Sequence, residues 1–494
     1  MSKEDGMRLF RPALALSLLV AGLTPAVASQ AAASKPQDDV TVIAVIDSGF
    51  SPYHQDFLAS EVPADIKALP LTKAPDTWVP GFPKRSAFAA YSPLSLTLDG
   101  EASTNMDALH TKDKAAWASV KQSTPTAIDY RWIPGTKVIG ALTFGAGGTI
   151  YGTGGAEHGM GTTSVAVGNH HGACPSCLLV FIQYADAASA EAALTWVHHQ
   201  PWIDAVSNSY GFSTGIVARD RIYNGTDVVT ERAASERGQT TFFSAGNGVE
   251  NAFTVPNSTL KSSQEGPDWV VTVGATDPNG KDYTGTGKPA DIAGIGVSYP
   301  SAYGSTTVSD GKNFSGTSNA TPQIAGTYGQ ALWTLRKNAA GASRTQAKGY
   351  VVGSSVTAKA LRSALFLSAV PTAGGYTDGL AGLAQTPAVA DSRFAAEGYG
   401  TFRGALNKDG GVAAEVARVV NIAHGGKPAA RPDGEKDWFV VDSWCRQMIW
   451  GAWTQGSYLN DAKTPVPNAN PVAWPTRTAI QEACPLLARS SSPK

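Results

Sequence analysis

The sequence predicts an α/β fold of three layers, in which a mostly parallel central sheet is flanked by helices. The first observation is that short apolar, β-branched runs alternate with helical patterns along the chain, as in successive βαβ units. The second is that the polar residues Asp47 and Asn247 come at or shortly after the ends of two of these runs. Functional groups collect at the carboxyl ends of the strands in such sheets.

The expected elements follow in chain order. Each expected strand is a short run, mainly of apolar and β-branched residues, that is too short for a helix, and each expected helix carries small and apolar residues at helical spacing. The strands are expected at 42–46, 138–142, 178–182, 205–207, 241–244 and 270–273, and the helices at 159–167, 188–198 and 228–236.

The N-terminus has the pattern of a secretory signal peptide. Arg8 and Arg11 precede an apolar run at 13–23, and the small residues of Pro25-Ala26-Val27-Ala28 fit a cleavage site after Ala28. A membrane anchor is the alternative, but this run is too short for a comfortable span. We therefore expect residues 1–28 to be removed and the mature protein to be secreted, with no membrane partner after cleavage.

Composition restricts the classes of partner. Among 494 residues the formal net charge is −1 and charged residues make up 16%, below the usual quarter. A chain with so little net charge has no long-range electrostatic attraction to nucleic acid or to acidic membranes. We expect a compact monomer without a nucleic-acid partner.

Four cysteines fit an oxidising compartment. The spacing of Cys174 and Cys177 suits a tight local disulfide, which leaves Cys445 and Cys484 as a second pair, although four cysteines allow three connectivities. A redox-active or zinc-binding Cys-x-x-Cys is less favoured, because the pair precedes a strand rather than opening a helix and has too few further ligands nearby.

Composition also divides the chain into segments. After a short N-terminal segment (29–39), a main domain spans 40–422, and its stretch from about 60 to 131 looks like an insertion with little periodicity. Residues 423–494 form a linker and a tail that contains Trp and Cys. The tail is either a small binding module or, as we prefer, a strap packed on the main domain, since a tail of this length makes a marginal independent domain.

Three segments supply the parts of a nucleophilic site, in the order Asp, His, Ser. Asp47 ends an apolar strand, His158 opens a helical run, and Ser318 stands in Gly316-Thr317-Ser318 before another. A serine hydroxyl needs a base to take its proton, which would be His158, and a carboxylate to orient that base, which would be Asp47. Asn247 and the backbone N–H of Ser318 would donate to the oxyanion.

Each residue has a plainer interpretation when it is taken alone. Asp47 suits a strand-end turn, Asn247 before a glycine is a common turn pair, and Ser318 suits a helix N-cap. His158 is one of eight histidines. The structural interpretations of these residues are independent of one another and do not explain why the motifs occur in this order. The catalytic interpretation explains all of them together and is therefore favoured.

Together the segments resemble the subtilisin-like serine proteases, or subtilases, from about residue 40 to 422. Asp47-Ser48-Gly49, His158-Gly159 and Gly316-Thr317-Ser318 match that family's three catalytic motifs, and Ser244-Ala245-Gly246-Asn247 resembles its oxyanion segment. The resemblance implies a subtilisin-like fold and a secreted serine endopeptidase that acts on peptides or proteins through an acyl-enzyme. It also implies substrate contacts from Ser209, Tyr210, Gly211, Ser244, Ala245 and Gly246.

Several departures from the family pattern qualify the expectation. Asn319 replaces the common Met after the nucleophile, which leaves substrate preference and rate open. The stretch between Ala28 and Val40 leaves no room for a prodomain, so we expect folding without one, helped by the 60–131 segment. The related sedolisins are excluded because Gly161 stands where their second helical acid would be needed.

Two alternatives and one cation site stay open. The first alternative is a catalytically silent binding protein of the same fold, and the second is a peptide transamidase or cyclase that uses the same triad. No cofactor is required. Asp277, Asn279 and Asp282 form an oxygen-rich loop that would suit structural calcium, but it lacks the later ligands of an EF-hand and a plain turn is favoured.

Overall fold

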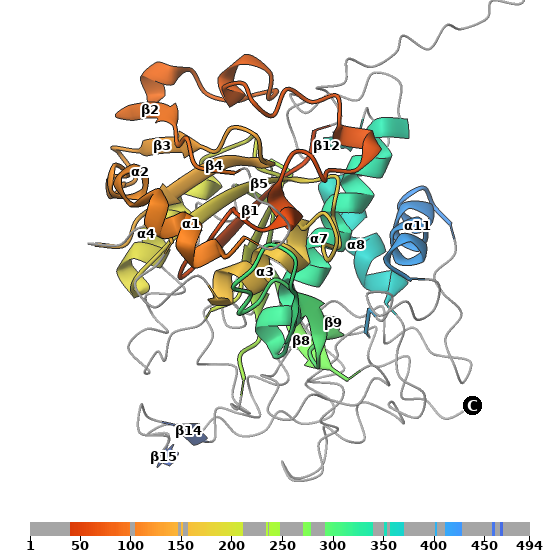
Figure 1. The fold of residues 1–494 in the computed structure, drawn as a ribbon. Helices are drawn as coiled ribbons and strands as arrows, with labels where there is room; N and C mark the ends of the chain where they lie inside the picture. Colours follow the sequence, from red (N-terminus) through yellow and green to blue (C-terminus); the bar gives the residue numbers. More distant parts are fainter. Residues whose placement is uncertain are drawn as a thin grey trace, which may run out of the picture. The chain divides into compact units, whose positions relative to one another are not determined.

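The structure, a computed structural model, describes residues 40–98, 104–146, 150–151, 157–210, 234–235, 237–247, 270–277, 292–338, 350–352, 356–369, 401–402, 411–426, 457–459 and 465–467. All of them belong to one compact unit, residues 34–494. Figure 1 shows its central sheet and the helices around it.

A nine-stranded sheet forms the middle layer of the described part. Its order is β2-β3-β4-β5-β1-β6-β7-β8-β9, and every neighbouring pair is parallel except β3 and β4. The strands are β1 (Val42–Asp47), β2 (Ala90–Pro93), β3 (Asp129–Trp132), β4 (Val138–Thr143), β5 (Leu178–Gln183), β6 (Ala205–Asn208), β7 (Thr240–Ser244), β8 (Val270–Thr276) and β9 (Ile292–Ile295).

Helices cover both faces of this sheet. On one face lie α3 (Glu157–Val167) and α7 (Thr317–Asn338), with α8 (Ala358–Ser368) and α11 (Gly411–Ala423) packed beside α7 (Figure 1). On the other face lies α4 (Ala187–His198). The predicted three-layer α/β fold with a mostly parallel sheet is therefore confirmed.

The alternation of side chains along β1 explains the two layers. Ile43 and Val45 join the core that includes residues of α3 and α7, whereas Val42, Ala44 and Ile46 join the core that includes residues of α4. A strand with both faces buried needs apolar residues at every position, as this run has. The central strands β1 and β5 are hydrophobic up to their last residue for this reason.

Short elements complete the described part. Helices α1 (Met106–Lys112) and α2 (Lys114–Ala118) and the 3₁₀ turns η2 (Gln55–Phe57), η3 (Ala64–Ile66), η4 (Pro75–Thr77) and η5 (Arg85–Ala87) lie between β1 and β3 in the chain. Three hairpins pair β10 (Tyr299–Ser301) with β11 (Lys312–Phe314), β12 (Tyr350–Val352) with β13 (Val356–Thr357), and β14 (Ser457–Leu459) with β15 (Pro465–Pro467).

All six predicted strands are present, each at or within a few residues of its predicted bounds, and so are the helices predicted at 159–167 and 188–198. The helix predicted at 228–236 falls mostly outside the described residues. Sequence patterns missed the edge strands β2 and β9, and also β3, because each has only four residues and carries polar or small side chains.

The 60–131 segment is built into the main fold. It supplies β2 and most of β3 at one side of the sheet. Its side chains Val62, Ile66 and Trp78 join the α4-side core, while Leu109 and Trp117 join the α3-side core. Large buried side chains of this kind fix a segment firmly to its domain.

Cys174 and Cys177 form a disulfide, as predicted for this local pair, in the loop between α3 and β5. Cys445 and Cys484, with the linker and the tryptophans of the tail, lie outside the described residues. Among the helices of the described part, none is long and apolar enough to cross a lipid bilayer.

Candidate active site

Asp47 lies at the carboxyl end of β1 and is buried. It continues the alternation of Ile43 and Val45, so its side chain points to the sheet face that α3 and α7 cover. Its carboxylate accepts hydrogen bonds from the Ser48 backbone N–H at 2.7 Å and from the Thr162 hydroxyl at 2.8 Å. These donors fix the orientation of the carboxylate.

His158 stands in the first turn of α3 and faces this carboxylate. The distances from its Nδ1 to the two carboxylate oxygens of Asp47 are 2.8 and 3.0 Å. Because Asp47 accepts, Nδ1 carries the proton and Nε2 is left with a lone pair. This tautomer is the one that a general base needs. The edge of the ring meets Phe314, with ring centroids 5.5 Å apart.

Two opposing effects set the pKa of His158. Burial lowers it, but the negative charge of Asp47 and the hydrogen bond to it raise it by more. The net result is a pKa above the ordinary value. Since 38% of the His158 side chain is exposed, against 2% for Asp47, the imidazole is accessible from outside whereas the carboxylate is not.

Gly159 lets α3 approach the loop after β1. A Cβ at Gly159 would lie 1.8 Å from the carbonyl oxygen of Gly49, a distance that no side chain tolerates. The His158-Gly159 motif therefore packs directly against the backbone of the Asp47-Ser48-Gly49 motif. The helix can present His158 to Asp47 only because Gly159 carries no side chain.

Ser318 is the second residue of α7, and its hydroxyl donates to the carbonyl of Ser209 at 3.2 Å. The Ser209 hydroxyl in turn donates to the carbonyl of Ser318 at 2.9 Å. That carbonyl would ordinarily accept from the residue four positions on, but this residue is Pro322, which has no N–H. The proline of the motif therefore frees the serine carbonyl for Ser209.

Asn247 follows β7 and is tied to the start of α7. Its Oδ1 accepts from the backbone N–H and the hydroxyl of Thr317, at 2.9 and 3.0 Å, which leaves Nδ2 as a donor. Gly316 has φ +102°, and a Cβ there would lie 3.0 Å from Nδ2. Only glycine suits this backbone and this close approach. The N–H of Ser318, in the first turn of the helix, cannot bond within the helix and is a second available donor.

The predicted substrate contacts lie at the ends of β6 and β7. Ser244 ends β7, and Ala245 and Gly246 continue toward Asn247. Tyr210 is buried against Tyr184, with ring centroids 4.7 Å apart. Gly211 lies outside the described residues. The role of these residues in substrate binding stays a prediction.

Asn319, the departure from the family pattern, is buried and joins the ends of strands β9 and β11. Its Nδ2 donates to the carbonyls of Ile295 and Phe314, at 2.9 and 3.2 Å. It therefore holds the segment that carries Phe314, whose ring meets His158. The side chain is completely buried, so it acts on the site by holding the surrounding backbone in place.

Thr162 was not predicted from the sequence as a partner of Asp47. Thr162 lies four residues after His158 on α3, a spacing that puts two side chains on the same face of a helix. That spacing was the available signal. Of the expected cation ligands, only Asp277 is described, and no cluster of three His, Cys, Asp or Glu side chains suited to a metal occurs in the described part of the chain.

Comparison with known proteins places the chain in a family. The model of the subtilase family (Peptidase_S8) matches residues 38–382, so the chain belongs to the subtilases, a family of which most members are serine proteases. No curated protein matches it.

Among solved structures, the prenylagaramide maturation protease PagA is similar, at 15% identity over 80% of this chain and 96% of its own, with a TM-score of 0.41. A mutant of the protease domain of PatA is similar at 14% identity over 79% of this chain and 97% of its own, with a TM-score of 0.40. A cold-adapted subtilisin-like serine proteinase is similar at 15% identity over 63% of this chain and 80% of its own, with a TM-score of 0.33.

Proposed function

We propose that this protein is a secreted serine endopeptidase that hydrolyses peptide bonds through Ser318, His158 and Asp47. The observation that carries the proposal is the pairing of a buried Asp47 carboxylate with Nδ1 of His158, while Ser318 opens a helix beside Asn247. No single one of these arrangements is specific, but their combination has the parts of nucleophilic acyl transfer.

In the proposed reaction, the Ser318 hydroxyl turns from the Ser209 carbonyl toward Nε2 of His158 when a substrate binds. His158 takes the proton as Oγ attacks the scissile carbonyl, and Asp47 stabilises the imidazolium that forms. Nδ2 of Asn247 and the N–H of Ser318 stabilise the oxyanion. His158 then protonates the leaving amine. In the second half of the reaction, His158 takes a proton from water as the water attacks the acyl carbonyl, and then returns it to the Ser318 oxygen as the acyl group leaves.

The pH dependence of activity should follow His158. The reaction needs this residue neutral, and its pKa is raised above the ordinary value by Asp47, so activity rises as the pH rises through that pKa. We expect activity to persist at roughly pH 7–9. Measuring kcat/KM against pH with a fluorogenic peptide checks this, and an optimum near about pH 4 would contradict a histidine base.

Labelling of the purified protein with a fluorophosphonate tests the nucleophile directly. We expect one modified residue, Ser318, as found by mass mapping, because only an activated hydroxyl attacks such a probe rapidly. Heat denaturation and the His158→Ala variant should both abolish the label. Folded protein that stays unlabelled would contradict the proposal and would favour a catalytically silent binding protein.

The same acyl-enzyme can be resolved by an amine instead of water, which is the transamidase alternative. Incubation with a peptide substrate and analysis of the product masses separates the two outcomes: hydrolysis adds one water, and transfer or cyclisation does not.

Secretion is part of the proposal and rests on the pattern of residues 1–28 alone. N-terminal sequencing of the exported protein tests it.

A further inference from the structure

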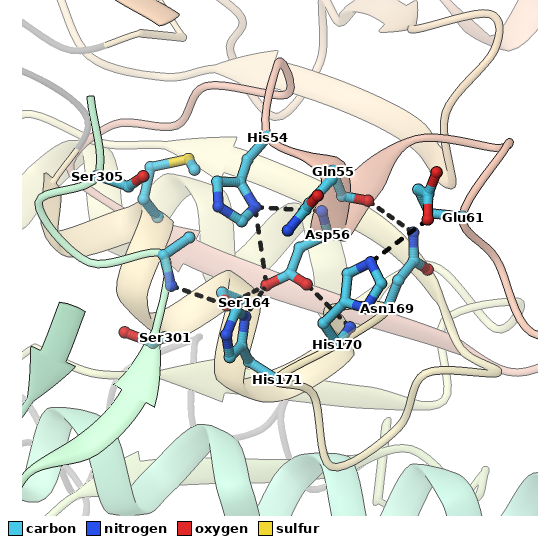
Figure 2. Close-up of polar contacts among 12 residues, drawn as sticks. His54, Gln55, Asp56, Glu61, Ser164, Asn169, His170, His171, Ser301 and Ser305 are labelled. Carbon is cyan, nitrogen blue, oxygen red and sulfur yellow. Dashed lines mark hydrogen bonds and ion pairs between the residues drawn. The ribbon is translucent and has the colours of Figure 1, made fainter. Parts of the chain in front are cut away.

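A second cluster of titratable side chains, most of them buried, lies around the later part of α3, the helix that carries His158. It consists of His54, Asp56, Ser164 and His171, and we call it the Asp56 cluster (Figure 2). Asp56 and His54 are completely buried, and His171 is 21% exposed. Nothing in the proposed reaction uses these residues, so their concentration in the interior calls for an explanation.

The Asp56 carboxylate is saturated with donors from one region of the chain. It accepts from the Ser164 hydroxyl at 2.6 Å, from Nδ1 of His171 at 2.6 Å and from the backbone N–H of His170 at 2.9 Å. The carbonyl of Asp56 accepts from the N–H of Asn169 at 2.9 Å. All of these donors belong to the C-terminal half of α3 or to the loop after it. Asp56 thus clamps the helix that carries His158.

His54 is held in one tautomer by two backbone groups. Its Nδ1 accepts from the N–H of Asp56 at 3.1 Å, so the proton sits on Nε2, which donates to the carbonyl of Asp310 at 2.7 Å. Burial lowers the pKa of His54 and keeps the ring neutral. The ring therefore links η2 to the loop between β10 and β11.

The same loop and strands are bound to the cluster at two more points. Ser164, while donating to Asp56, accepts from the N–H of Ala302 at 3.0 Å. The hydroxyl of Tyr299 donates to the carbonyl of His171 at 3.3 Å. The segment 299–314 that makes these contacts leads directly into Gly316-Thr317-Ser318.

Three segments that carry or lead to triad residues are therefore joined through Asp56 and the side chains around it. The chain that leaves Asp47 contains Asp56 itself, α3 carries both His158 and Ser164, and the 299–314 segment leads to Ser318. A buried, fully bonded charge of this kind is costly to disturb and has one arrangement only. It is suited to fix the relative positions of these segments.

The charges around Asp56 favour its ionised form. Burial raises its pKa, but the hydrogen bond and charge of His171 and the bond from Ser164 outweigh this and lower the pKa to about 2. The hydrogen bond to Asp56 raises the pKa of His171. Burial lowers the pKa of the nearby Lys137 to about 7, although the charge of Asp56 raises it, and Lys137 donates to the carbonyls of Val167 and Pro175.

We propose that Asp56 is a positioning residue for the triad, which sets the placement of His158 and Ser318 relative to Asp47 through Ser164, His171 and His54. It touches neither the substrate nor the reacting atoms, and the inference rests on the proposed function. Loss of the carboxylate would leave Ser164 and His171 competing for one amide oxygen and would loosen both α3 and the 299–314 segment.

The test is the Asp56→Asn variant, which keeps the size of the side chain and removes its charge. We expect kcat to fall by about 10- to 100-fold with KM nearly unchanged, since small misplacements of reacting groups have effects of this size. We also expect the pKa of His158, measured by NMR titration of its ring, to fall toward its ordinary value as its contact with Asp47 weakens.

Asp204→Asn is the matched control, because Asp204 is a buried carboxylate that pairs with Arg336 at 2.8 Å near the start of β6, away from the triad. It should lose stability without a change in kcat per labelled site or in the pKa of His158. Should Asp56→Asn not fold, Ser164→Ala removes one bond and is expected to shift both readouts in the same direction.

The NMR titration keeps this inference separate from the proposed function, since it needs no turnover. An unlabelled wild-type protein would contradict the protease proposal alone. A His158 pKa and a kcat per labelled site that stay at wild-type values in folded Asp56→Asn or Ser164→Ala would overturn the positioning role.

Discussion

Replacement of Asp47 by asparagine is expected to lower kcat by about 10⁴-fold while the fold is kept. A loss of this size is known for the same change in a serine protease of unrelated fold. Here the carboxylate accepts from Nδ1 of His158, from the Ser48 N–H and from the Thr162 hydroxyl. An amide of the same shape has one acceptor and one donor group in place of two acceptors.

The physical reason is the tautomer of the base. If the amide N–H₂ faces His158, Nδ1 becomes the acceptor and the ring proton moves to Nε2, where it blocks removal of the Ser318 proton. The charge that raises the pKa of His158 is also lost. The remaining activity should therefore rise at a lower pH than in the wild-type protein, because a less basic histidine becomes neutral earlier.

The measurement is kcat with a fluorogenic peptide, together with the rate of fluorophosphonate labelling of Ser318. Asp65→Asn is a matched control that removes an exposed carboxylate paired with Lys337, and it should leave both rates unchanged. An Asp47→Asn enzyme that keeps more than about a tenth of the wild-type kcat would mean that His158 does not depend on Asp47.

The strands and the motif positions could be predicted because both depend on local sequence. A strand buried on both faces must be apolar at every position, so the run before Asp47 is visible without any knowledge of its neighbours. Register then accounts for the grouping of the motifs. Asp47 ends β1, and Ser209 and Asn247 come after β6 and β7. These three strands are adjacent and parallel, so their carboxyl ends lie at one end of the sheet.

The missed features depend on contacts between distant segments. The edge strand β2 has partly exposed side chains and owes its conformation to pairing with β3, which its own four residues cannot indicate. None of Asp56, His54 and His171 was among the site residues predicted from the sequence. Their bonds join positions 108 to 256 residues apart, a separation at which a single sequence carries no signal.

Asn319 shows how a departure from a family pattern can be interpreted only in three dimensions. From the sequence its effect on substrate preference stayed open, because a polar residue beside a nucleophile could face the substrate. In the structure it is buried and bonded to the carbonyls of Ile295 and Phe314. Its amide therefore holds the ends of β9 and β11 together.

Replacement of Asn247 by leucine is expected to lower kcat by about 10²- to 10³-fold with little change in KM, the usual cost of one oxyanion donor. The donor interacts with charge that develops only in the transition state, so ground-state binding should not change. In the structure, Oδ1 of Asn247 accepts both hydrogen bonds from Thr317. Its Nδ2 takes no part in these bonds and is the group that would donate to the oxyanion.

Two further variants distinguish the role of Asn247 Nδ2 as an oxyanion donor from a role of Asn247 in holding the start of α7. Asn247→Asp keeps the acceptor for Thr317 but replaces Nδ2 with an oxygen that repels the oxyanion, so its loss in kcat should be at least as large. Thr317→Val removes only the hydroxyl bond to Oδ1 and leaves the backbone bond, so its loss should stay below about 10-fold. If Thr317→Val matched Asn247→Leu in kcat, Asn247 would act through loop placement, and the oxyanion donor would have to be sought elsewhere at the start of α7.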